Sequence, residues 1–122
     1  MTFEFGPRVR LRARAQFVAV QDNGRRVASR YLTMLAIPND AGHDRLGIIA
    51  SRRLGGAVVR NRAKRRVRDI FRRLDPVGSV ASGERTLDLV VIPRREVASA
   101  PMADLEKEFA AGLRKLRQTR TT

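Results

Sequence analysis

One segment, from Ala57 to Leu74, constrains the fold of this chain more than any other. Its apolar side chains recur at the spacing of one face of an α-helix; they are Val59, Ala63, Val67, Ile70, Phe71 and Leu74. The other faces are basic, because ten basic residues and a single acid, Asp69, lie between Arg52 and Arg73. We expect a helix that begins after the turn-forming pair Gly55-Gly56, packs its apolar stripe on a core and leaves a cationic surface outside.

Three other segments predict the strands of a sheet. Residues Val27 to Ile37 alternate in polarity and predict one strand. Arg45 to Ser51 predicts a second, and the short connection after Pro38 favours an antiparallel hairpin between the two. Thr86 to Ile92 is a nearly continuous apolar and β-branched run bounded by Pro93, which predicts a strand buried on both faces.

Two further helices complete the predicted order, α-β-β-α-β-α. Gln16 to Val20 predicts a short helix that ends near Asn23-Gly24, and Met102 to Leu116 predicts an amphipathic one. A helix between strands of the same sheet makes a crossover. We therefore expect an α+β fold, a two-layer sandwich of one central sheet with two to three helices, in a single domain over residues 1–116. Residues 117–122 are expected to form a disordered basic tail.

Charge narrows the class of partner. Twenty-six basic residues face twelve acidic ones, which gives a net charge of +14 and a pI near 11.8. Such a surface favours a polyanion. An anionic membrane is the alternative, but the basic segment lacks the wide apolar face of a membrane-surface helix. The absence of cysteine excludes disulfides, thiolate zinc sites and a cysteine nucleophile. No secretory signal opens the chain, and we expect a cytoplasmic protein.

The arginine-rich segment supplies the candidate nucleic-acid contacts. A solvated helix surface would interleave glutamate with lysine, whereas this one is mainly arginine, whose planar fork binds phosphate in two places. Arg52 and Arg53 precede the helix N-terminus, which itself favours anions. The predicted RNA-binding residues are Arg52, Arg53, Arg60, Asn61, Arg62, Lys64, Arg65, Arg66, Arg68 and Arg72.

The block from Arg45 to Arg68 also carries a pattern in fixed register. It contains an Arg-hydrophobic-Gly strand, a serine followed by two basic residues, and a Gly-x-Ala-Val step. These lead into Arg60-Asn-Arg-Ala-Lys-Arg-Arg-Val-Arg68. This block resembles the signature of the bacterial ribonuclease P protein subunit. The likeness extends more loosely to the Leu11…Phe17 opening, the strand that begins at Leu87 and the last amphipathic helix.

The resemblance implies a function for the whole chain. Family members join a catalytic RNA that removes the 5′ leader of precursor tRNA, and the RNA carries out the hydrolysis with bound Mg²⁺. The protein would be the accessory subunit of an endoribonuclease, with the catalytic RNA and precursor tRNA as partners, no membrane and no required protein oligomer. The resemblance also implies that the basic helix lies in a left-handed βαβ crossover, against the common rule.

A cleft between the first helix and the sheet holds the single-stranded leader in this family. Carried over to this chain, the cleft would contain Phe17, Tyr31 and Leu35. A base that stacks on an aromatic side chain gains about 1–3 kcal/mol. Gln21 and Leu35 stand where relatives can have further aromatics, so apolar contact and arginine would carry more of the binding here. Phe17 and Tyr31 could instead be ordinary core residues.

Several alternatives remain open at this stage. Asn61 could cap the opening turns of the basic helix or contact RNA. His43 with Asp40 and Asp44 forms a weak metal-site candidate, against the simpler interpretation of a solvated loop, so we assign no metal or catalytic residue to the chain. A structural ribosomal protein is the rival function, although it would have no reason to carry the Arg60–Arg68 motif. A sequence-specific DNA-binding protein is a third alternative, but this chain lacks the paired short helices of a helix-turn-helix motif.

Overall fold

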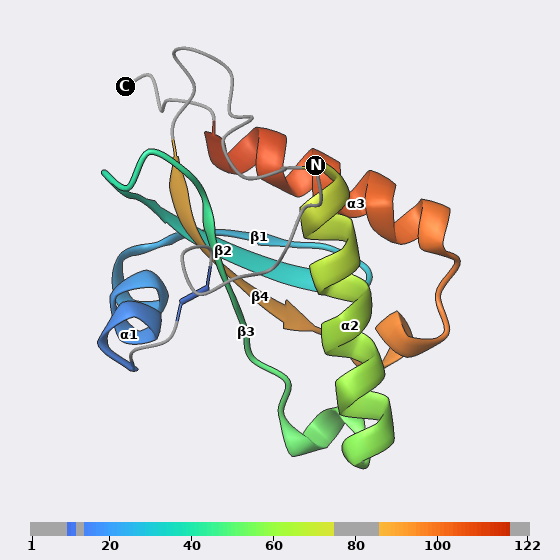
Figure 1. The fold of residues 1–122 in the computed structure, drawn as a ribbon. Helices are drawn as coiled ribbons and strands as arrows, with labels where there is room; N and C mark the ends of the chain where they lie inside the picture. The colour runs from blue at the N-terminus through green and yellow to red at the C-terminus, as the bar shows by residue number, and fades with distance from the viewer. Residues whose placement is uncertain (1–9, 12–13, 75–85, 118–122) are drawn as a thin grey trace.

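A four-stranded mixed sheet forms the centre of the molecule, and helices lie on both of its faces (Figure 1). The computed structural model describes residues 10–11, 14–74 and 86–117. The strands are β1 (Arg25–Ala28), β2 (Leu32–Pro38), β3 (Arg45–Ile48) and β4 (Leu87–Pro93), in the spatial order β1-β2-β4-β3. The helices are α1 (Arg14–Asn23), α2 (Ala57–Leu74) and α3 (Met102–Arg117), with short 3₁₀ turns η2 (Arg52–Leu54) and η3 (Arg95–Ala98). The expected α+β class is confirmed.

The predicted pairing of the first two strand segments is wrong. The segment Val27 to Ile37 is divided between β1 and β2, which form the hairpin themselves, with Ala28 opposite Thr33. The turn closes through Ser29, whose backbone N–H and hydroxyl both donate to the carbonyl of Leu32 at 2.9 Å. β3 pairs with β4 and not with β2. The apolar run of β4 explains this order, because a strand of that composition is most stable where both its faces and both its edges are covered.

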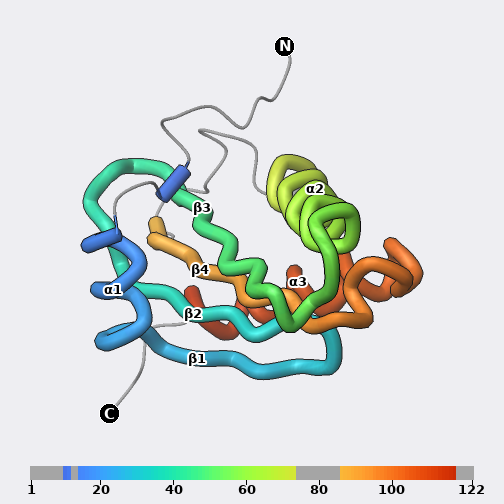
Figure 2. Tube along the Cα trace, turned by 90° about the horizontal axis from the view of Figure 1, so that it is seen from below, coloured from blue at the N-terminus to red at the C-terminus, as the bar shows by residue number. Residues whose placement is uncertain are grey.

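The connection from β3 to β4 is a parallel crossover through α2. β3 and β4 run in the same direction, and Gly47 lies opposite Val90 in their register. Seen along the strands, the chain passes from β3 through α2 and back to β4 in a left-handed sense (Figures 1 and 2). This is the rare hand of a βαβ unit. The crossover places the basic helix on the same face of the sheet as α3.

Two apolar clusters lie on the two faces of the sheet. The larger one joins the sheet to α2 and α3 and contains Ala63, Val67, Ile70 and Phe71 of α2, which confirms the predicted stripe. The smaller one lies under α1 and consists of Leu11, Val20, Leu35 and Val90, with Phe17 and Ile37 packed against it. Figure 2 shows α1 apart from α2 and α3, with the strands between them. The sheet therefore separates α1 from the basic helix everywhere except at the β3 edge.

The end of α3 is tied to the start of β3. Arg117 donates to both carboxylate oxygens of Asp44, and the backbone N–H of Leu87 donates to Asp44 Oδ1 at 2.8 Å. Arg117 is therefore the last residue of α3 and not part of a tail, while residues 118–122 lie outside the described part of the chain. Asp44, which the sequence offered as a weak candidate for a metal ligand, is instead bound to Arg117. Within residues 10–11, 14–74 and 86–117 no group of three or more His, Cys, Asp or Glu side chains could hold a metal.

Candidate nucleic-acid interface

The outward side of α2 carries an open pocket. We call it the outer groove, and it is lined by Val58, Asn61, Arg62, Arg65, Arg66 and Asp69. Asn61, Arg62 and Arg65 are exposed, and Val58 is 82% exposed although it is apolar. The apolar stripe of α2 faces the core, so these side chains are forced to point to solvent at helical spacing. Asn61 lies between two arginines on this surface, a position suited to contact with a nucleic acid.

Not every basic residue of α2 is available to a ligand. The guanidinium of Arg66 donates to the carbonyl of Val97 at 2.7 Å and to that of Ala100 at 2.6 Å. Arg66 thus fastens α2 to the segment between η3 and α3. Arg72 lies 3.6 Å from Asp69, one helical turn away, and Arg73 lies 2.8 Å from Glu106 of α3. Arg66 and Arg72 are predicted from sequence to bind RNA like Arg62 and Arg65, but their structural surroundings differ.

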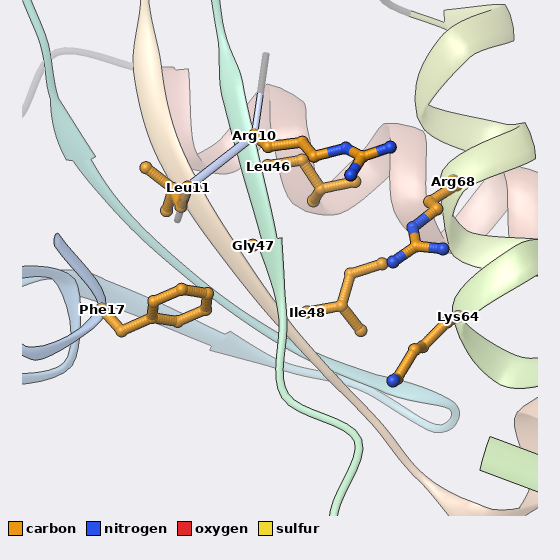
Figure 3. A pocket seen from close by; sticks show the side chains of 8 residues that line it. All are labelled: Arg10, Leu11, Phe17, Leu46, Gly47, Ile48, Lys64 and Arg68. Carbon is orange, nitrogen blue, oxygen red and sulfur yellow. The ribbon is translucent and has the colours of Figure 1, made fainter. Parts of the chain in front are cut away.

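Two predicted contacts of α2 face inward, toward the sheet edge. Lys64 and Arg68 line a cavity of about 130 Å³ that we call the inner pocket. The other lining residues are Arg10, Leu11, Phe17, Leu46, Gly47 and Ile48. Figure 3 shows Phe17 reaching toward β3 from α1 while Lys64 and Arg68 reach toward the same strand from α2. The pocket therefore combines an aromatic wall with cationic groups, which is the composition of a site for single-stranded nucleic acid.

Like charges converge at the inner pocket. Burial lowers the pKa of Arg68 below its usual value, and the nearby charges of Arg10 and Arg72 lower it further. Burial is the larger cause of the lowered pKa and like-charge repulsion the smaller one, and the arginine itself stays protonated. A bound phosphate would relieve this repulsion, because it replaces a like-charged environment by an opposite charge. The three basic side chains that line the pocket, Arg10, Lys64 and Arg68, therefore favour an anion there.

The residues predicted for the leader cleft are divided between the two faces of the sheet. Phe17 and Leu35 lie together in the cluster under α1, and Phe17 also lines the inner pocket. Tyr31 is 7% exposed and belongs to the cluster on the other face, next to α3. Its backbone N–H donates to Glu108 Oε2 at 2.9 Å, and the guanidinium of Arg30 lies 5.1 Å from its ring centre. The structure does not bring Tyr31 to Phe17.

The remaining predicted residues lie around the start of α2. Arg52 and Arg53 are exposed in η2, directly before Gly55-Gly56. Arg60 is half-buried, and its backbone N–H donates to the carbonyl of Gly56 at 3.0 Å, which closes the first turn. Arg52 and Arg53 thus add exposed cations in the segment between β3 and α2. Gln21 is exposed on α1.

Three residues in or near the site have roles that the sequence did not predict. Arg10 lines the inner pocket because its segment adds to the edge of β3, where the N–H of Leu11 donates to the carbonyl of Leu46 at 2.9 Å. Gly47 also lines the inner pocket and lies directly against the ring of Phe17. Arg45 donates to both carboxylate oxygens of Asp88, at 2.7 and 2.8 Å.

Arg45 therefore acts within the protein, although it belongs to the block that suggested RNA. The hydrogen bond from Arg45 to Asp88 is the main cause of a raised pKa at Arg45. The side-chain amide of Asn39 donates to the same carboxylate at 2.8 Å. A signal was present in the sequence, since an acid inside the apolar run of β4 needs a buried partner.

Comparison with known proteins finds relatives that match most of the chain. The family described as Ribonuclease P matches residues 5–117. The chain is 39% identical to the ribonuclease P protein component of Thermotoga maritima over 98 residues, and this match covers 80% of each chain. It is 42% identical over 105 residues to that of Chloroflexus aggregans, covering 86% of this chain and 75% of the relative.

Solved structures agree with this likeness. The ribonuclease P protein of Thermotoga maritima is similar with a TM-score of 0.72 at 31% identity, over 92% of this chain and 98% of that one. The Staphylococcus aureus protein is similar with a TM-score of 0.72 at 27% identity, over 90% and 98% of the two chains. Across the described residues, no helix combines the length and apolarity that crossing a membrane requires.

Proposed function

This chain belongs to the ribonuclease P protein family, and we propose that it binds the catalytic RNA of that enzyme and the 5′ leader of precursor tRNA. In this role it assists endonucleolytic removal of the leader, in the bacterial cytoplasm where precursor tRNA is made. The hydrolysis is assigned to the RNA subunit. A structural ribosomal protein is not favoured by any of the family matches.

One observation carries the proposal, namely that the cations of α2 point in two directions. Asn61, Arg62 and Arg65 face solvent in the outer groove, where a folded RNA could dock against a rigid helix. Lys64 and Arg68 face Phe17 in the inner pocket, which fits one segment of single-stranded nucleic acid. We assign the outer groove to the catalytic RNA and the inner pocket to the leader.

This division changes one expectation from sequence. From sequence, Arg65 and Arg68 are both predicted to bind RNA on one cationic surface of the helix. In the fold Arg68 lies in the inner pocket with Phe17, so we propose that it contacts leader phosphate. We assign Mg²⁺ mainly to the RNA subunit, as the family resemblance implies.

Reconstitution with the cognate RNA and a leader-bearing precursor tRNA tests the proposal. We expect the protein to lower the Mg²⁺ concentration needed for cleavage and to tighten precursor binding relative to mature tRNA. Both quantities are measured by titration of the same assembled enzyme. A protein that changes neither the Mg²⁺ requirement nor precursor affinity would contradict the assignment to ribonuclease P.

Phe17→Ala tests the inner pocket separately. Loss of a base–aromatic interaction of ~1–3 kcal/mol predicts precursor binding weaker by about fivefold or more. Mature tRNA, which has no leader, should bind as before, and so should the catalytic RNA. Equal losses for precursor and mature tRNA would place the leader elsewhere.

A further inference from the structure

The ring of Phe17 occupies the space where a side chain at position 47 would lie. A Cβ atom on Gly47 would be 2.5 Å from Cε1 and 2.7 Å from Cζ of Phe17, and 3.1 Å from Cβ of Leu11. Non-bonded carbon atoms are attracted at about 3.5–4.0 Å and repel strongly at shorter distances. The ring in its present place and any side chain at position 47 therefore exclude each other.

The backbone offers no other reason for a glycine here. Gly47 is paired within β3, and only Gly42 and Gly55 have positive φ among the described glycines. A glycine inside a strand weakens it and leaves nothing to pack, so such a residue commonly marks a close approach by another group. In this protein the approaching group is the ring of Phe17. The absence of a side chain at Gly47 is therefore what allows the ring of Phe17 to lie against β3.

That space determines the form of the inner pocket. Phe17 is half-buried against the cluster of Leu35 and Val90, and its ring forms the aromatic wall of the pocket. Lys64 and Arg68 form the opposite wall, and β3 passes between the two (Figure 3). A methyl group on Gly47 would push the ring off β3. The aromatic wall of the inner pocket would then shift.

We propose that Gly47 is a positioning residue for leader binding, because it fixes the place of the Phe17 ring and with it the width of the inner pocket. The inference rests on the proposed function of that pocket. It adds that leader affinity depends on a backbone position of β3 which itself contacts no base. The two closest atoms in conflict are Cε1 and Cζ of the ring, which a leucine at position 17 lacks, whereas the milder contact with Cβ of Leu11 is the same in both backgrounds.

The test is a double-mutant cycle in the assembled enzyme, with the ratio of precursor to mature tRNA affinity as readout. Gly47→Ala should lower this ratio about fivefold or more, the effect expected when a base–aromatic interaction is spoiled. Phe17→Leu should lower it by itself. Adding Gly47→Ala to Phe17→Leu should then change it less than twofold, because the two sites act through one interaction.

Gly112→Ala in α3 is the matched control. A Cβ there meets the sulfur of Met34 in the cluster on the other face, so this variant also crowds a core. It should alter the unfolding temperature and leave the tRNA affinity ratio unchanged. Binding of the catalytic RNA alone, measured for every variant, reports whether the protein is folded.

Three results would overturn the inference. The first is a wild-type affinity ratio after Gly47→Ala. The second is an equal decrease on adding Gly47→Ala to wild type and to Phe17→Leu. If Gly47→Ala does not fold, the double variant decides: folding restored by Phe17→Leu supports the conflict with the ring, and continued unfolding overturns it. A wild-type enzyme that does not distinguish precursor from mature tRNA would instead refute the proposed function itself.

Discussion

Arg65 and Arg66 of α2 are adjacent in the chain and differ in what they contact. Arg65 is exposed in the outer groove, whereas Arg66 donates to the carbonyls of Val97 and Ala100. Arg65→Ala is expected to weaken binding of the catalytic RNA roughly tenfold, the effect of removing a charged hydrogen bond of ~1.5 kcal/mol, with no change in stability. Binding is measured by filter retention or anisotropy.

Arg66→Ala is expected to give the opposite result. It leaves two carbonyls without their donor and lowers the free energy of unfolding by about 2 kcal/mol. RNA affinity, measured at a temperature where the variant is folded, should change less than twofold. Urea unfolding of both variants makes the comparison, and a stable Arg66→Ala protein with poor RNA binding would reverse the assignment.

The pair also shows what sequence could determine at the scale of one residue. The apolar stripe of α2 was predicted because periodicity reports which side chains face the core. The partners of the arginines were not predicted, because a guanidinium donates equally well to a phosphate, as we assign for Arg65, or to a protein carbonyl, as for Arg66. Arg45 is a second example, since it lies in the block that resembles an RNA-binding signature and yet binds Asp88.

At the scale of elements, helices were predicted better than strand order. α2 and the start of α3 fall at the expected residues, because a long amphipathic pattern and its flanking glycine or proline mark both ends. The apolar run of β4 correctly predicted a strand buried on both faces, but it does not name the neighbours of that strand. The inner pocket could not be predicted either, because it depends on β3 being an edge strand with α1 and α2 on its two sides.

The ion pair between Asp44 and Arg117 joins two distant elements, and its removal should destabilise the fold. The side chain of Asp44 is 1% exposed and that of Arg117 is 15% exposed. Asp44→Asn leaves the arginine without a counter-charge and is expected to lower the free energy of unfolding by about 3 kcal/mol.

Arg73→Ala is the control for this prediction, because the bridge from Arg73 to Glu106 is far more exposed and should contribute less than about 1 kcal/mol. Similar decreases in urea unfolding for both variants would show that burial does not set the strength of these pairs.

At the scale of the whole molecule, a net charge of +14 makes RNA binding a matter of counterion release. The affinity for the catalytic RNA should fall steeply with salt, by roughly 10³-fold or more between 50 and 200 mM if six or more phosphates are contacted. The distribution of charge decides which residues set this dependence. Exposed cations of the outer groove should contribute to it, whereas arginines that are bound to protein groups should not.

The slope of log affinity against log salt concentration tests this distribution directly. Replacing both Arg62 and Arg65 by alanine should reduce the slope by about two, because each phosphate that a cation neutralises accounts for about one unit of it. Lys107→Ala, an exposed charge on α3, changes the net charge without touching the outer groove and should leave the slope unchanged. If Lys107→Ala reduced the slope as much as a groove arginine does, the affinity would follow net charge alone. The direction in which α2 faces would then have no part in binding.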